Sequence, residues 1–198
     1  MKIKICGLRR IEDIDAVNEA KPDYAGFILS EGFRRSIDLT KMRELKERLS
    51  NDIPAVGVFV NEDPDRISKL LLEGIIDLAQ LHGNEPEEEV IRIRESTGKP
   101  VIKYVRAADA AQIEAWLGSS ADYLLFDSGT GTGKTFDWSV LGGIERPFFL
   151  AGGLSAENLE EAYHRVNPFA ADLSSGVETD GWKDRDKILQ AVKKVRSL

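Results

Sequence analysis

Cysteine and histidine are almost absent from this 198-residue sequence, which has one cysteine, Cys6, and two histidines, His82 and His164. A single cysteine excludes an intramolecular disulfide, which fits a reducing compartment such as the cytoplasm. The three residues lie far apart and lack the ligand spacing of a zinc site, so we expect no metal.

Long apolar runs are also missing. No segment approaches the roughly 20 apolar residues that a membrane-spanning helix needs. The N-terminal segment Met1–Gly7 lacks the apolar core of a signal peptide. We therefore expect no membrane association and a cytoplasmic location.

An excess of positive charge is absent too. The chain has 27 lysines and arginines against 34 acidic residues, a formal net charge of −7. Such a balance argues against general binding to nucleic acid or to anionic membranes. A local positive site for one small anionic ligand remains compatible with it.

Short β-rich runs alternate with longer amphipathic stretches along the chain. The predicted strands are Ile3–Cys6, Tyr24–Leu29, Ala55–Val60, Leu78–Leu81, Val101–Val105, Tyr123–Phe126, Phe148–Leu150 and Phe169–Leu173. The predicted helices are Arg10–Ala20, Leu39–Leu49, Pro64–Glu73, Pro86–Ser96, Ala108–Leu117, Ser155–Val166 and Arg185–Arg196, with a short helical patch at Trp138–Leu141. Continuous apolar strands are typical of parallel sheets that are buried on both faces.

Eight successive strand-to-helix steps indicate an α/β protein. A closed barrel and a doubly wound sheet both consist of such steps, and eight of them favour the barrel. No linker or low-complexity segment divides the chain. We therefore predict a single (β/α)₈ TIM barrel that forms one domain over residues 1–198.

The active site of such a barrel lies at the carboxyl ends of the strands, and the loops after strands seven and eight often bind phosphate. Gly152-Gly153 follows the seventh predicted strand, just before Ser155, the expected N-cap of the next helix. Ser174-Ser175 and Gly176 follow the eighth. Each glycine motif could simply turn the chain, but their joint position predicts a phosphate site.

Two further strand ends carry groups suited to proton transfer. Cys6 ends the first predicted strand, and Lys4 lies two residues before it on the same face. A nearby ammonium favours the thiolate, so Cys6 could act as a base, although a lone cysteine is often only a small buried apolar residue. Asp127 follows the sixth strand. Partial desolvation there would make it a usable general acid, and an N-cap role is the plainer alternative.

The segment Gly129–Thr135 is rich in glycine and ends in Gly-Lys-Thr. A nucleotide-binding P-loop requires a glycine at the position occupied by Ser128, and a firm helix directly afterwards. Both are missing, so a mobile active-site loop is the better interpretation.

Three other polar residues fall near predicted strand ends. Arg35 follows the second strand, and its planar guanidinium suits a carboxylate, as does that of its neighbour Arg34. His82 follows the fourth strand and could bind a ligand or serve only the structure. His164 lies on a predicted helix and reads as a surface residue.

The ordered set of strand-end motifs resembles the phosphoribosylanthranilate isomerase family of tryptophan biosynthesis. The matching segments are Lys4–Gly7, Gly26–Leu29, Val56–Asn61, Gln80–Gly83, Leu124–Asp127, Gly131–Trp138, Leu150–Leu154 and Asp172–Glu178. This resemblance implies an intramolecular oxidoreductase, an aldose–ketose isomerase. It would catalyse the Amadori rearrangement of N-(5′-phosphoribosyl)anthranilate to 1-(2-carboxyphenylamino)-1-deoxyribulose 5-phosphate.

The resemblance also implies roles for individual residues. Cys6 would be the general base and Asp127 the general acid. Arg35, His82 and Asp172 would bind the substrate, and its phosphate would lie at Gly152, Gly153, Ser174 and Ser175. Two proton transfers need no cofactor and no metal. The expected partner is a small phosphorylated substrate, and the chain would be a monomer or a homodimer.

The sequence departs from the family pattern at two places. Phe33 and Arg34 replace a small serine and a proline before the arginine, and Thr130 replaces a glycine. Two other functions stay open at this point. One is a related sugar-phosphate isomerase of the histidine pathway, or a bifunctional enzyme that serves both pathways. The acid–base pair of those enzymes is typically two aspartates, and Cys6 argues against them. The other is a barrel that binds a phosphorylated ligand without catalysis.

Overall fold

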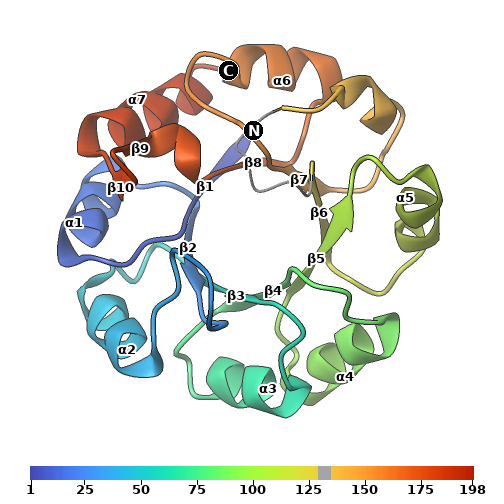
Figure 1. Cartoon of the computed structure of the whole chain (residues 1–198), viewed down its shortest axis with the longest axis horizontal. Helices are drawn as coiled ribbons and strands as arrows, with labels where there is room; N and C mark the ends of the chain where they lie inside the picture. Colours follow the sequence, from blue (N-terminus) through green and yellow to red (C-terminus); the bar gives the residue numbers. More distant parts are fainter. Residues whose placement is uncertain (129–134) are drawn as a thin grey trace.

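Eight parallel strands close into a barrel in the computed structural model, which describes residues 1–128 and 135–198. The strands follow one another around the barrel in chain order, and the eighth pairs with the first (Figure 1). They are β1 (Lys2–Cys6), β2 (Tyr24–Ile28), β3 (Ala55–Phe59), β4 (Leu78–Leu81), β5 (Val101–Arg106), β6 (Tyr123–Asp127), β7 (Phe148–Leu150) and β8 (Ala170–Leu173). The predicted TIM barrel is confirmed. Apart from Thr135, the predicted glycine-rich loop with Thr130 lies outside the described residues.

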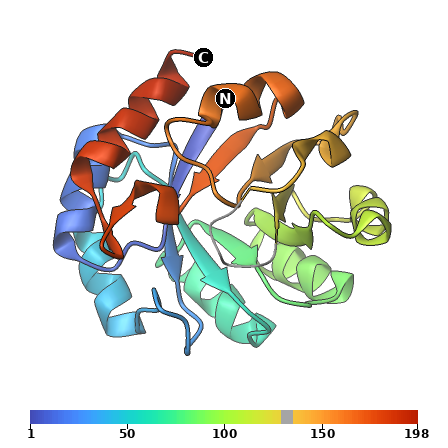
Figure 2. The same cartoon turned by 45° about the horizontal axis from the view of Figure 1, so that its top comes forward.

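Helices surround the strands, which are inclined to one another inside this ring (Figure 2). They are α1 (Ile11–Ala20), α2 (Leu39–Arg48), α3 (Pro64–Leu72), α4 (Glu87–Thr97), α5 (Ala110–Leu117), α6 (Leu159–Val166) and α7 (Arg185–Arg196). A 3₁₀ turn, η1 (Trp138–Leu141), follows β6, and another, η2 (Ser175–Val177), follows β8. Aspartates cap several helix starts, as Asp184 does for α7 by accepting hydrogen bonds from the first turn. Within the described ranges, no helix is long and apolar enough to cross a membrane.

The start of α6 differs from the prediction. The helix begins at Leu159, four residues after Ser155, which is therefore not its cap. The side chain of Asn158 accepts a hydrogen bond from the Ser155 amide and donates one to the Gly153 carbonyl. These side-chain bonds hold the segment in turns and compete with helix formation, so the loop after β7 is longer than expected.

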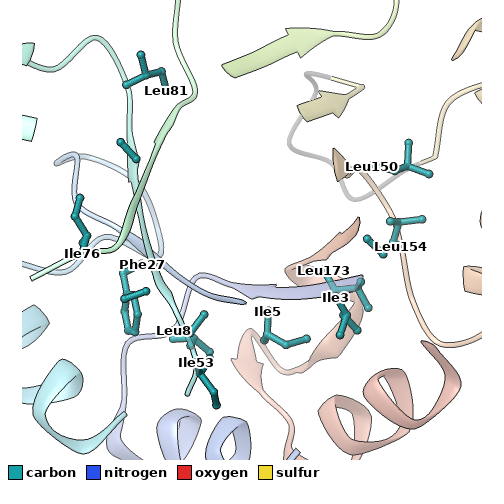
Figure 3. Packing of buried hydrophobic residues seen from close by; sticks show 14 of the residues in the cluster. Ile3, Ile5, Leu8, Phe27, Ile53, Ile76, Leu81, Leu150, Leu154 and Leu173 are labelled. Carbon is teal, nitrogen blue, oxygen red and sulfur yellow. The ribbon is translucent and has the colours of Figure 1, made fainter. Parts of the chain in front are cut away.

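Apolar side chains fill two separate regions. The larger cluster lies between the strands and the helices and includes Ile3, Ile5 and Leu173 (Figure 3). The smaller cluster lies inside the barrel and includes Val56, Ile102, Leu125 and Phe149. Because side chains alternate along a strand, the strands from β2 to β8 contribute to both regions, whereas β1 contributes only to the larger one. At the carboxyl ends of the strands, polar side chains such as Gln80 and Asp172 lie beside apolar ones such as Ile28 and Val58.

A short hairpin not foreseen in the sequence follows η2. It consists of β9 (Glu178–Thr179) and β10 (Trp182–Lys183). Asp180 and Gly181 form its turn with φ values of 52° and 80°, the left-handed conformation that Asp-Gly adopts in tight hairpins. The hairpin lies beside α1 and α7 (Figure 1). It brings Glu178 and Lys183 to the end of β1.

Candidate active site

A cavity of about 520 Å³ opens at the carboxyl ends of the strands. All nine residues predicted for the site line it, namely Cys6, Arg35, His82, Asp127, Gly152, Gly153, Asp172, Ser174 and Ser175. They come from six different strand ends and their loops, so the barrel alone brings them together. In residues 1–128 and 135–198, no three His, Cys, Asp or Glu side chains group as metal ligands.

Cys6 lies beside a buried ion pair. Lys4 Nζ is 2.9 Å from Asp172 Oδ2 and 2.8 Å from Gln80 Oε1, and the lysine is completely buried. Gly26 on the neighbouring strand makes room for this arrangement. A Cβ at Gly26 would lie 2.8 Å from Cys6 Sγ and 3.0 Å from Lys4 Cε. The thiol and the lysine therefore lie over the same glycine, as their shared strand face predicted.

Burial and the neighbouring charges shift the pKa values of Cys6 and Lys4 in opposite directions. Burial raises the pKa of the Cys6 thiol, and the Lys4 ammonium acts in the opposite direction. Burial also disfavours the Lys4 ammonium, but the Asp172 carboxylate outweighs it and raises the pKa of Lys4. Lys4 thus stays charged next to the thiol, which is the condition under which a thiolate can form.

A chain of polar side chains extends from this ion pair across the cavity floor. Gln80 Nε2 is 2.9 Å from His82 Nδ1, and the His82 ring stacks on Tyr104 at 4.4 Å between centroids. Burial lowers the pKa of His82, so its imidazole is neutral near neutral pH. Asp172 Oδ1 is buried and has no hydrogen-bond partner among the described residues. A buried oxygen of this kind is suited to accept a hydrogen bond from a hydroxyl group of a ligand.

Asp127 ends β6 and lines the same cavity as Cys6. The Ser128 hydroxyl donates a hydrogen bond of 3.1 Å to its Oδ1. Gly152 approaches the carboxylate closely, since a Cβ there would lie 3.0 Å from Asp127 Oδ1. Gly152 also has a φ of 86°, which favours glycine. The carboxylate therefore lies against the glycine loop that follows β7.

The two predicted phosphate loops pack directly against each other. A Cβ at Gly176 would lie 1.9 Å from the Leu154 carbonyl oxygen, so only glycine fits at this contact. The Ser174 hydroxyl donates a 3.1 Å hydrogen bond to the carbonyl of Cys6. The loop after β8 is thus tied both to the loop after β7 and to the end of β1.

The structure distinguishes the two arginines after β2. Arg35 lines the cavity and its side chain is 19% exposed, whereas that of Arg34 is 56% exposed and is not part of the lining. Both bind Glu178, for which the sequence predicted no individual role. Phe33 lines the cavity and is 47% exposed, at its open side. The signals for Glu178 in the sequence were its place at the end of the matching segment Asp172–Glu178 and the Asp-Gly turn two residues later.

Comparisons with known proteins agree with this geometry. Residues 3–194 match the family described as N-(5′-phosphoribosyl)anthranilate (PRA) isomerase. An N-(5′-phosphoribosyl)anthranilate isomerase of Endomicrobium trichonymphae is 48% identical over 202 residues, covering 100% of this chain and 99% of its own. A crystal structure described as monomers of the dimeric Thermotoga maritima enzyme is 35% identical, with a TM-score of 0.88 and full coverage of both chains.

A further solved structure is described as a phosphoribosyl anthranilate isomerase in complex with reduced 1-(o-carboxyphenylamino)-1-deoxyribulose 5-phosphate. It is 34% identical to this chain, with a TM-score of 0.88 and full coverage of both chains. The matches span nearly the whole sequence and the whole barrel. This chain belongs to the N-(5′-phosphoribosyl)anthranilate isomerase family.

Proposed function

We propose that the cavity converts N-(5′-phosphoribosyl)anthranilate to 1-(2-carboxyphenylamino)-1-deoxyribulose 5-phosphate, the Amadori step of tryptophan biosynthesis, with Asp127 as general acid and Cys6 as general base. One observation carries this proposal. An acidic and a basic candidate, on β6 and β1, line one cavity together with the two packed glycine–serine loops. The reaction needs these groups and no cofactor.

The chemistry consists of two proton transfers around the sugar. Asp127 protonates the ribose ring oxygen, the bond from that oxygen to C1′ breaks, and an iminium forms at C1′. The Cys6 thiolate then removes the proton from C2′, and the electron pair gives an enolamine. Tautomerisation moves the hydroxyl proton from O2′ and adds a proton at C1′. C1′ is thereby reduced and C2′ oxidised within one molecule.

The remaining residues hold the substrate between the acid and the base. The loops with Gly152, Gly153, Ser174 and Ser175 bind the phosphate through backbone N–H groups and hydroxyls. Arg35 binds the anthranilate carboxylate. Lys4 stabilises the Cys6 thiolate, and His82 and Asp172 bind polar groups of the sugar.

Two properties of the molecule accompany this assignment. The reaction belongs to soluble metabolism, and the chain carries a single cysteine, so we place the protein in the cytoplasm. One relative is described as dimeric, and we expect a monomer or a homodimer here.

The proposal is tested with Cys6→Ala and Asp127→Asn. Each variant is expected to lower kcat by about 10²-fold or more, because each removes one acid–base group. Binding of the reduced product analogue should survive in both, since the phosphate loops and Arg35 are untouched. Asp15→Asn, which removes a carboxylate paired with Arg48 on the surface, serves as the matched control.

Steady-state turnover and analogue binding by calorimetry provide the two readouts. Near-normal turnover by both variants would show that the assigned mechanism is wrong. A parallel assay with the aminoimidazole substrate of the histidine pathway addresses the rival isomerase. Comparable turnover of both substrates would replace the assignment with a bifunctional one.

A further inference from the structure

Glu178 lies at the centre of a cluster of cations beside the cavity. Its Oε1 is 2.6 Å from Arg35 Nε and 2.8 Å from Lys183 Nζ. Its Oε2 is 2.8 Å from Arg35 Nη2 and 2.8 Å from Arg34 Nη2. The Glu178 side chain is only 6% exposed and that of Lys183 only 1%. One buried carboxylate therefore binds three cationic side chains.

The contact with Arg35 occupies one edge of the guanidinium. A guanidinium has five N–H donors in a rigid planar fork. Glu178 binds the edge formed by Nε and Nη2, which leaves Nη1 and the second hydrogen of Nη2 for another partner. That edge can bind a second carboxylate with both of its oxygens.

The aliphatic stem of Arg35 packs against the backbone at the end of β1. A Cβ at Gly7 would lie 2.5 Å from Arg35 Cδ, so the arginine crosses directly over the residue that follows Cys6. Gly7 has a φ of 81°, a conformation that favours glycine. The stem of Arg35 therefore packs on Gly7, while its guanidinium is bound to Glu178 at the edge of the cavity.

The charges of the cluster do not cancel. Three cations, Arg34, Arg35 and Lys183, face one carboxylate, so the cluster keeps an excess of two positive charges. Burial disfavours the Glu178 carboxylate, but hydrogen bonds from Arg35 and Lys183 outweigh it and lower its pKa to about 2. Glu178 is thus ionised at neutral pH and still leaves a field that attracts an anion.

We propose that Glu178 is a positioning residue that fixes the guanidinium plane of Arg35, and thereby sets the preference of the cavity for a substrate with a ring carboxylate. The inference rests on the proposed function, in which Arg35 binds that carboxylate. Lys183 supports it as the partner of Glu178 across the hairpin of β9 and β10, where the two residues pair directly. The hairpin is therefore part of the substrate-recognition apparatus.

The test compares two ligands that differ in one group. The first is reduced 1-(o-carboxyphenylamino)-1-deoxyribulose 5-phosphate, and the second is the same molecule without the ring carboxyl. Their dissociation constants are measured by calorimetry, and the ratio of the two constants is the carboxylate preference. Since both ligands carry the same phosphate, changes at the phosphate loops cancel in this ratio.

Glu178→Gln replaces one acceptor oxygen by a donor, which cannot accept from Arg35 Nη2. We expect it to lower the carboxylate preference by about 10-fold, because one charge-assisted hydrogen bond that orients Arg35 is lost. Glu178→Asp keeps a carboxylate for buried Lys183 and protects folding, but withdraws it by one methylene. It should also lower the preference. Glu19→Gln breaks a similar two-bond pair with Arg185 on the surface and should leave the ratio unchanged.

The outcomes separate the two proposals. Equal binding of both ligands by the unmodified protein would show that the assignment of Arg35 is wrong. If the unmodified protein prefers the carboxylated ligand and Glu178→Gln keeps that preference, only the positioning role of Glu178 is overturned. An increased preference in Glu178→Gln would also overturn it, because it would mean that the Glu178 carboxylate competes with the ligand for Arg35. Loss in Glu178→Gln with full retention in Glu178→Asp would assign the effect to charge and not to position, and would also overturn it.

Discussion

Two buried lysines on barrel strands form ion pairs of nearly equal geometry, yet they belong to different parts of the molecule. Lys4 on β1 is 2.9 Å from Asp172, and Lys103 on β5 is 2.6 Å from Glu85. All four side chains are at most 7% exposed. Lys4 points into the barrel beside Cys6, whereas Lys103 points outward. The side of the strand, and not burial, therefore decides which pair serves the cavity.

The outward pair organises a loop. Lys103 Nζ also donates to the Gly83 carbonyl at 2.8 Å. Glu85 accepts hydrogen bonds from the backbone amides of Asn61 and Gly83. The pair thus joins the loop after β3 to the loop after β4. The Lys103 pair therefore stabilises loops at the carboxyl ends of the strands from outside the barrel, whereas the Lys4 pair acts on Cys6, the proposed general base.

The comparison is tested most strongly by Lys4→Met, for which we expect the largest effect. Without the ammonium, the pKa of Cys6 rises and less thiolate is present, so kcat/KM should fall by about 10-fold or more. The acid limb of its pH profile should move to higher pH. Asp172 is left as an unpaired buried charge, which costs about 3–5 kcal/mol of stability. An unshifted pH profile would contradict the role given to Lys4.

Lys103→Met is the matched control, since it removes the same group from an equally buried strand position. We expect a similar loss of about 3–5 kcal/mol in the free energy of unfolding, because Glu85 loses its counter-charge. The pH dependence of turnover per folded molecule should stay unchanged. Urea unfolding and a pH profile below the melting transition measure the two effects. A shift of the acid limb in Lys103→Met would contradict the inference that only the Lys4 pair acts on Cys6.

Much of the barrel could be predicted from the sequence, because short apolar runs separated by amphipathic stretches have few other solutions. The eight predicted strands lie within one or two residues of those observed. The misplaced start of α6 depends on the side chain of Asn158, whose hydrogen bonds with Ser155 and Gly153 no periodicity reveals. Local hydrogen bonding therefore decided the one helix boundary that was wrong by several residues.

The candidate site was predictable only in part. Cys6 and Asp127 end their strands, and the barrel rule places all strand ends at one rim. Glu178 contacts Arg35 across 143 residues of sequence, and such a contact leaves no local pattern. Tyr104 shares a strand face with Ile102, yet it lacks an obvious partner in the sequence, since its contact with His82 comes from the neighbouring strand. Glu178 and Tyr104 were therefore missed, whereas Lys4 was found because it lies two residues from Cys6 on the same strand.

A third buried lysine pair, Lys183–Glu178, extends the comparison and gives the smallest expected effect. The pKa of Glu178 is lowered from its ordinary 4.5 to about 2, so its contribution to stability is present above pH 4.5 and is lost as the pH falls towards 2. One pKa unit corresponds to about 1.4 kcal/mol, so a fall of about 2.5 units corresponds to at most about 3.5 kcal/mol. Urea unfolding at pH 7, 4 and 3 should show the difference between the unmodified protein and Glu178→Gln shrinking with acidity. A constant difference would mean that the carboxylate charge of Glu178 does not stabilise the fold, in contrast to the effect expected for the charges of the Lys4–Asp172 and Lys103–Glu85 pairs.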